Sequence, residues 1–117
     1  MDELCEISLL LDFYGQLITQ RQYEILDLHY NSDYSFGEIA QYLKISRQGV
    51  YDNIKRGKAA LNSFEQKLKL VGRFSEQRNK AKEILELLSG MEFSSLRIQD
   101  SERLTTVQQL VRQIMED

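Results

Sequence analysis

The chain contains no proline among its 117 residues, and this absence constrains its fold more than any other feature. Proline occurs in the turns of β-rich folds, and it interrupts helices when it falls inside them. Apolar residues also recur every three or four positions along most of the sequence, which is the period of an α-helix that buries one face. We therefore expect an all-α protein.

Six helices are expected from this period and from the residues that begin and end helices. They span about 3–14, 20–30, 36–43, 46–72, 74–89 and 100–116, with a connector or short helix at 91–99. Thr19, Ser46 and Asp100 are the expected N-caps, and Ser35 with Glu38 has the spacing of a capping box. The predicted organisation is a single domain over 1–117. It has an N-terminal helix, a core at about 17–70 and a C-terminal helical extension at about 73–117.

The most informative segment is 35–56, where a turn of about three residues separates two helices. Ala40 lies where the first helix must approach the second closely, and Ile45 is placed to fill the gap at the turn. Val50 and Ile54 are one helical turn apart and should face inward. This pattern is typical of a helix-turn-helix, although any tight pair of antiparallel helices shares part of it.

Charge is distributed very unevenly along the chain. Residues 1–43 hold one base and eight acids (net −7), residues 44–82 hold eleven bases and three acids (net +8), and residues 83–117 hold three bases and seven acids (net −4). The overall net charge of −3 is unlike that of a dedicated nucleic-acid-binding domain. A basic segment nevertheless attracts phosphate through its local field. The charge pattern leaves open whether the lysines bind phosphate or only solvate a long helix.

One face of the helix that follows Ser46 carries side chains suited to DNA. Arginine reads guanine and glutamine reads adenine in the major groove, whereas lysine contacts phosphate. A carboxylate such as that of Asp52 repels phosphate but accepts a hydrogen bond from cytosine. The alternative is a solvated polar face. The candidate nucleic-acid-binding residues are Arg47, Gln48, Tyr51, Asp52, Lys55 and Lys58.

The residue inventory argues against an enzyme. The chain has one histidine, His29, and one cysteine, Cys5, which cannot form a structural zinc site or a disulfide. His29 is expected to be packed in an amphipathic helix, and Cys5 is expected to be a small core residue. No glycine-rich phosphate loop occurs. We expect no catalytic residue, metal, cofactor or small-molecule substrate.

The sequence also predicts a cytoplasmic protein with no membrane partner. No apolar run is longer than three residues, far short of a membrane span. The chain opens with Met1, Asp2 and Glu3, which is acidic where a signal peptide is basic.

Two resemblances follow from the helix-turn-helix segment. Residues 17–61, with Glu38-Ile39-Ala40, Ile45-Ser46, Val50 and Ile54, resemble region 4 of bacterial sigma factors. A narrower resemblance is to the YlxM family, and it covers about residues 7–75. Its most specific part is the segment Ser46-Arg47-Gln48-Gly49-Val50-Tyr51-Asp52-Asn53-Ile54-Lys55-Arg56. That family consists of small all-helical bacterial proteins whose genes lie beside those of the signal recognition particle GTPase and its receptor. The resemblance to region 4 implies base contacts at Arg47, Gln48, Tyr51 and Asp52.

Two functions of different classes are compatible with these observations. The first is a DNA-binding regulator that acts on double-stranded DNA as a homodimer. The second is an interaction module that binds the signal recognition particle, through its RNA or its GTPase. The homodimer is expected to form through the terminal helices, where an apolar stripe comprises Leu104, Val107, Val111 and Ile114. The alternative is a last helix that folds back on the first within one chain.

Overall fold

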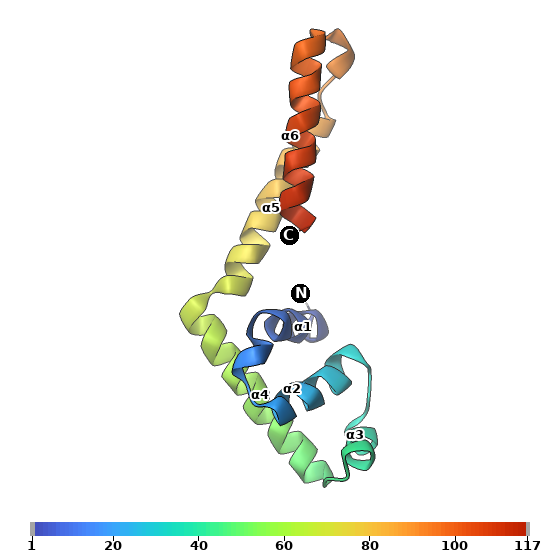
Figure 1. Cartoon of the computed structure of the whole chain (residues 1–117), viewed down its shortest axis with the longest axis vertical. Helices are drawn as coiled ribbons and strands as arrows, with labels where there is room; N and C mark the ends of the chain where they lie inside the picture. The colour runs from blue at the N-terminus through green and yellow to red at the C-terminus, as the bar shows by residue number, and fades with distance from the viewer. Residues whose placement is uncertain (1, 117) are drawn as a thin grey trace. The chain divides into compact units, whose positions relative to one another are not determined.

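The computed structural model describes residues 2–116, which form six α-helices and no strand (Figure 1). The prediction of an all-α fold is confirmed. The described residues fall into two compact units that meet between Val71 and Gly72, and each unit is described by itself below. The single-domain organisation over 1–117 stays a prediction.

The first unit contains four α-helices and the second is built from two. The first unit comprises α1 (Glu3–Tyr14), the 3₁₀ helix η1 (Gly15–Leu17), α2 (Gln20–Leu26), the π-helix η2 (Asp27–Asn31), α3 (Phe36–Leu43) and α4 (Arg47–Leu68). Next come α5 (Leu70–Ser89), the 3₁₀ helix η3 (Phe93–Ser95) and α6 (Ile98–Glu116). The predicted second helix therefore continues past Leu26 as a π-helix, a rare form in which each bond spans five residues.

Helix starts in the first unit follow the predicted caps. Ser35 and Glu38 form a capping box, with hydrogen bonds of 3.1 and 3.0 Å between each side chain and the other's backbone N–H. Thr19 forms a second capping box with Gln22, and the Ser46 hydroxyl accepts from the backbone N–H three residues further on. These bonds satisfy amide groups that have no partner within the helix.

The core of the first unit is organised around α4. Val50, Ile54 and Leu61 are buried on the face of α4 that contacts α1, α2 and α3. Ala40 is buried where α3 meets α4, as expected. The other core residues are Ile7, Leu10, Leu11, Tyr14, Ile25, Leu26, Ile39 and Val71.

Gly57 permits the close crossing of α2 and α4. A Cβ at this position would lie 2.7 Å from Cδ1 of Leu26 and 3.4 Å from Cβ of Gln22. Leu26 is fully buried, so its side chain has little room to move aside. Glycine therefore sets the distance between the two helices.

The break between α4 and α5 differs from the prediction. The fourth helix was expected to continue to about Gly72, but it ends at Leu68 and Lys69 adopts the left-handed conformation (φ 55°). The Tyr14 hydroxyl donates to Oε1 of Glu65 at 2.6 Å and accepts from the backbone N–H of Leu70 at 3.0 Å. The backbone N–H of Val71 also donates to Oε1 of Glu65. A tyrosine from α1 thus stabilises the start of α5.

In the second unit, α5 and α6 lie side by side in opposite directions (Figure 1). Ala81 of α5 and Val111 of α6 are buried, and Nη1 of Arg78 donates to the carbonyl of Met115 at 2.8 Å. Leu104 is half-buried, whereas Val107 and Ile114 of the predicted stripe are exposed.

Two predictions about single residues are wrong. Asp100 is not the N-cap of the last helix, which begins two residues earlier at Ile98. Its carboxylate lies in the first helical turn, where it is favoured by the helix dipole and by Arg97 and Arg103, 3.6 and 3.7 Å away. Cys5 is exposed rather than part of the core, because it lies on the solvent side of α1.

The close crossing at Gly57 predicts a large effect of a bulky side chain. Gly57→Leu should lower the free energy of unfolding by about 1–3 kcal/mol or more, because the added atoms overpack a filled crossing. Ala59→Leu adds a similar side chain at an exposed position of the same helix and should change stability by less than about 0.5 kcal/mol. Chemical denaturation followed by circular dichroism measures both. Equal stability of the two variants would contradict the account of this crossing.

The hydroxyl of Tyr14 predicts a second effect. Burial and then the hydrogen bond to Glu65 raise the pKa of Tyr14, so the hydroxyl stays protonated and acts as a donor. Tyr14→Phe should cost about 1–3 kcal/mol of unfolding free energy, because it removes one hydrogen bond to the half-buried carboxylate of Glu65 and the one from the backbone N–H of Leu70. Tyr42→Phe is the matched control, since Tyr42 is 64% exposed. If Tyr14→Phe were as stable as this control, the hydrogen bonds of the Tyr14 hydroxyl to Glu65 and Leu70 would not stabilise the junction between α4 and α5.

Candidate nucleic-acid interface

The helix-turn-helix consists of α3, a turn at residues 44–46, and α4. Lys44 ends α3 in the left-handed conformation (φ 59°), and the backbone N–H of Ile45 donates to the carbonyl of Ala40 at 3.1 Å. The Ile45 side chain is half-buried against the core, as the sequence predicted. The turn therefore leaves the first residues of α4 at an exposed end of the unit.

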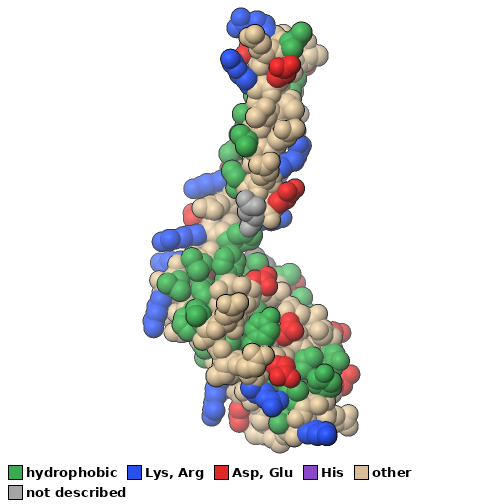
Figure 2. All heavy atoms as spheres, viewed as in Figure 1, with side chains coloured by type: hydrophobic (Ala, Val, Ile, Leu, Met, Phe, Trp, Pro, Cys, Tyr) green, Lys and Arg blue, Asp and Glu red, His purple; other side chains and the backbone are tan. Residues whose placement is uncertain are grey.

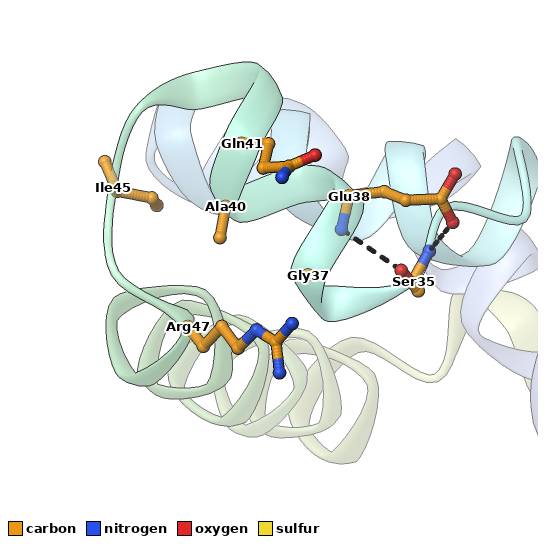
Figure 3. Close-up of a pocket in the computed structure, with 7 residues that line it drawn as sticks. All are labelled: Ser35, Gly37, Glu38, Ala40, Gln41, Ile45 and Arg47. Carbon is orange, nitrogen blue, oxygen red and sulfur yellow. Dashed lines mark hydrogen bonds between the residues drawn. The ribbon is translucent and has the colours of Figure 1, made fainter.

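Arg47 is the first residue of α4, and its guanidinium extends beneath α3 (Figure 3). It lies close to Gly37, where a Cβ would come within 2.9 Å of Nη2. The two residues line an open cleft of about 430 Å³ with Ser35, Glu38, Ala40, Gln41 and Ile45. Arg47 remains exposed, so its guanidinium is accessible from solvent at this end of the motif.

Gln48 and Asp52 interact with each other one helical turn apart. Nε2 of Gln48 donates to Oδ1 of Asp52 at 3.0 Å. This bond orients the amide of Gln48 and leaves its carbonyl oxygen and second N–H available. Asp52 is half-buried, and its carboxylate holds the amide of Gln48, one of the predicted site residues.

Tyr51 joins an aromatic group that the sequence did not indicate. It is 48% exposed, and its ring centroid lies 6.5 Å from that of Phe36. Both rings line a pocket of about 250 Å³, together with Tyr30, Ile54, Lys55 and Lys58. His29 packs against Tyr30 and Phe36, and its Nδ1 lies 2.7 Å from the carbonyl of Tyr34, so the prediction of a packed histidine is confirmed.

Lys58 is engaged by the N-terminal helix. Its ammonium binds the carboxylate of Glu3 and lies 5.8 Å from the centre of the Tyr30 ring. The Tyr30 hydroxyl also donates to Oε1 of Glu3, at 3.1 Å. The hydrogen bond from Lys58, and then that from Tyr30, lower the pKa of Glu3, whereas the bond to Glu3 raises the pKa of Lys58.

The six predicted residues thus fall into distinct environments on α4. Arg47, Gln48, Tyr51 and Lys55 are exposed and share one side of the helix, Asp52 supports Gln48, and Lys58 is paired with Glu3.

Sequence reasoning omitted two exposed bases, Lys44 in the turn and Arg56 on the flank of α4, although both lie in the basic segment that it identified. Figure 2 shows Lys and Arg side chains recurring along the α4 edge of the first unit. Tyr30 and Phe36 lie 21 and 15 positions before Tyr51, and no sequence pattern connects them.

Residues 2–116 contain no group of three His, Cys, Asp or Glu side chains placed to hold a metal ion. None of the helices described is long and apolar enough to cross a membrane.

The all-α fold, the three-residue turn and the exposed start of α4 define a helix-turn-helix protein. A family profile with the description "Putative helix-turn-helix protein, YlxM / p13 like" matches residues 1–101. The chain belongs to this family, UPF0122, which confirms the predicted resemblance to the YlxM family.

Similar proteins span most of this chain. A UPF0122 protein of Acetivibrio thermocellus is 54% identical over 116 residues, which cover 99% of each chain. A UPF0122 protein of Thermoanaerobacter sp. is 44% identical over 115 residues, covering 98% of this chain and 96% of its own. The UPF0122 protein YlxM of Bacillus subtilis is 41% identical over 90 residues, covering 77% of this chain and 82% of its own.

The Glu3–Lys58 pair predicts a pH effect on stability. Folding lowers the pKa of Glu3, chiefly through the hydrogen bond from Lys58. The ionised carboxylate therefore stabilises the fold above its unfolded pKa, and this stabilisation is lost as the pH falls through the lower pKa of the folded state. Glu3→Gln should therefore reduce the dependence of unfolding free energy on pH between about 5 and 3. The effect should be small, because the pair is exposed.

A Lys58→Met background is the control for this pH effect. With the ammonium gone, Glu3→Gln should have a smaller influence on the acid dependence, as a double-mutant cycle would show. An equal influence of Glu3→Gln with and without Lys58 would mean that the pair does not act in solution.

Proposed function

We propose that the protein is a DNA-binding regulator whose α4 enters the major groove of double-stranded DNA. The observation that carries the proposal is that Arg47, Gln48 and Tyr51 are exposed at the first turns of a helix whose opposite face is buried. A recognition helix needs this arrangement, because the residues near its N-terminus reach the base edges. In this proposal the protein acts in the cytoplasm, is not an enzyme, and needs no cofactor or small-molecule substrate.

The side chains have different roles in this proposal. Arg47 donates to guanine, and Gln48, oriented by Asp52, reads adenine. Lys55, Lys44 and Arg56 contact phosphates and position the helix without reading sequence. Lys58 contributes less to phosphate binding than Lys55, because Glu3 already neutralises it. This assignment follows the resemblance to sigma region 4, in which the second helix of the motif reads promoter DNA.

Two copies acting together are part of the proposal. Helix-turn-helix proteins commonly bind two half-sites spaced about one turn of DNA, or about 34 Å. A homodimer would supply the two motifs that such a site needs.

A specific observation favours a second candidate, binding to the RNA of the signal recognition particle. Proteins that recognise RNA loops stack unpaired nucleobases on aromatic side chains, and they bind the phosphate backbone with basic side chains such as lysine. The pocket lined by Tyr30, Phe36 and Tyr51 has Lys55 and Lys58 at its edge, which provides both features. Binding to the particle's GTPase has no comparable feature among the residues described.

Substitutions on α4 test the DNA proposal. Arg47→Ala and Gln48→Ala should each reduce discrimination between a selected duplex and a scrambled one by about 1–3 kcal/mol. Lys55→Ala should weaken binding to both duplexes and lower the salt slope by about one. Fluorescence anisotropy with labelled genomic duplexes measures these effects. Lys67→Ala, on another side of α4, is the matched control and should have little effect.

Equal losses on both duplexes from Arg47→Ala, Gln48→Ala and Lys55→Ala would mean that binding is non-specific, and no loss from any of these three changes would contradict the proposal. Tyr51 separates the two candidates. If the particle's RNA is the ligand, Tyr51→Ala should abolish most RNA binding, Tyr51→Phe should retain it, and Arg47→Ala should matter little. Tight binding to a duplex that survives Tyr51→Ala would exclude the RNA candidate.

A further inference from the structure

Gly37 lies at a position where the backbone does not require glycine. It is the second residue of α3, and no glycine described among residues 2–116 has a positive φ, so its conformation is one that other residues adopt. Glycine inside a helix is less favourable than alanine, because it loses more conformational freedom on folding. α3 has only eight residues in which to offset this cost. The feature that distinguishes glycine here is therefore the space that its missing side chain leaves.

The guanidinium of Arg47 occupies that space (Figure 3). The three atoms nearest to a Cβ at position 37 would all belong to this group: Nη2 at 2.9 Å, Cζ at 3.3 Å and Nε at 3.3 Å. An added methyl group would displace the guanidinium without disturbing the core, because Arg47 is an exposed and flexible side chain. Gly37 therefore affects where the guanidinium lies more than it affects the packing of the fold.

The donors of this guanidinium are available to a ligand. Arg47 forms no ion pair within residues 2–116. Among the described residues that line the cleft of about 430 Å³, Glu38 carries the carboxylate, and its Oε1 accepts from the backbone N–H of Ser35 at 3.0 Å. Ordering a long side chain costs entropy on binding, and a side chain that is already restricted loses less. Contact with α3 thus restricts the orientation of the Arg47 donors before a ligand arrives.

We infer that Gly37 is a positioning residue that determines the sequence specificity of Arg47. The inference rests on the proposed function, in which Arg47 reads guanine, and it adds a residue of α3 to that contact. A guanidinium binds guanine through two donors at once, so a small displacement breaks one of the two bonds. Contacts to phosphate carry no sequence information, and a displaced Arg47 can still form one. A side chain at position 37 should therefore reduce discrimination between sequences more than overall affinity.

A graded series at this position tests the inference in the full-length protein. Gly37→Ala and Gly37→Val place side chains of increasing size against the guanidinium. Gly37→Val should reduce the preference for the selected duplex over a scrambled one by about fivefold or more, and Gly37→Ala should reduce it less. Neither change should lower the thermal unfolding temperature, and alanine should raise it, because both residues favour a helix more than glycine does. Specificity and stability should thus change in opposite directions.

Two controls separate positioning from other effects. Gly90→Ala is the matched substitution, because a Cβ there would make an ordinary contact of 3.6 Å with the carbonyl oxygen of Leu87. It should leave the duplex preference unchanged. In an Arg47→Ala background, Gly37→Val should cause no further loss of preference, because the guanidinium through which Gly37 acts is gone.

The mobility of the Arg47 guanidinium tests the positioning without nucleic acid. The heteronuclear NOE of its Nε–H group should be lower in Gly37→Val than in the unmodified protein, and unchanged in Gly90→Ala. If the larger side chain disturbs folding, Gly37→Ala gives the same test. An NOE that does not change would overturn the inference.

The binding measurements distinguish failure of the inference from failure of the proposed function. A folded Gly37→Val protein that keeps its full preference would overturn the inference, as would an equal loss on both duplexes. An equal effect of Gly37→Val with and without Arg47 would also overturn it. Failure of the proposed function would already be visible in the unmodified protein, which would then prefer no sequence.

Discussion

The packing of one face of α4 is the constraint on which the rest of the structure depends. Val50, Ile54 and Leu61 are buried against α1, α2 and α3, and Gly57 lets α2 approach closely. This fixes the rotation of α4 and so decides which residues face solvent. Arg47, Gln48, Tyr51 and Lys55 are exposed because the opposite side of the helix forms the core. The candidate interface is therefore a consequence of core packing.

Local signals in the sequence predicted much of the fold, and contacts between distant residues account for most of the rest. The caps at Thr19, Ser35 and Ser46 involve residues three positions apart, so the sequence displays them directly. The end of α4 was missed because it depends on a hydroxyl 51 positions from its acceptor, with no glycine or proline at the break. The π-helix Asp27–Asn31 likewise contains no glycine or proline that would mark the change of helix type in the sequence.

In the candidate site, too, local features could be predicted from the sequence, whereas contacts between distant residues could not. A helical wheel was enough to select the exposed residues of α4, because it needs only the period of one helix. It could not show that Glu3 neutralises Lys58, or that Tyr30 and Phe36 form a pocket with Tyr51, since these residues come from other elements. The wheel also placed Gln48 and Asp52 near each other without indicating that they bond. In the proposed function this pairing gives Asp52 the role of orienting Gln48, where the sequence had suggested a direct contact with a base.

The central claim is that α4 reads double-stranded DNA, and the most direct measurement is a selection from the genome. The purified protein would be incubated with genomic fragments and, separately, with the RNA of the signal recognition particle, at two salt concentrations. The account predicts enrichment of fragments sharing one sequence, with affinity that falls at higher salt but retains its preference. Enrichment of no shared sequence, or binding to the RNA alone, would contradict it.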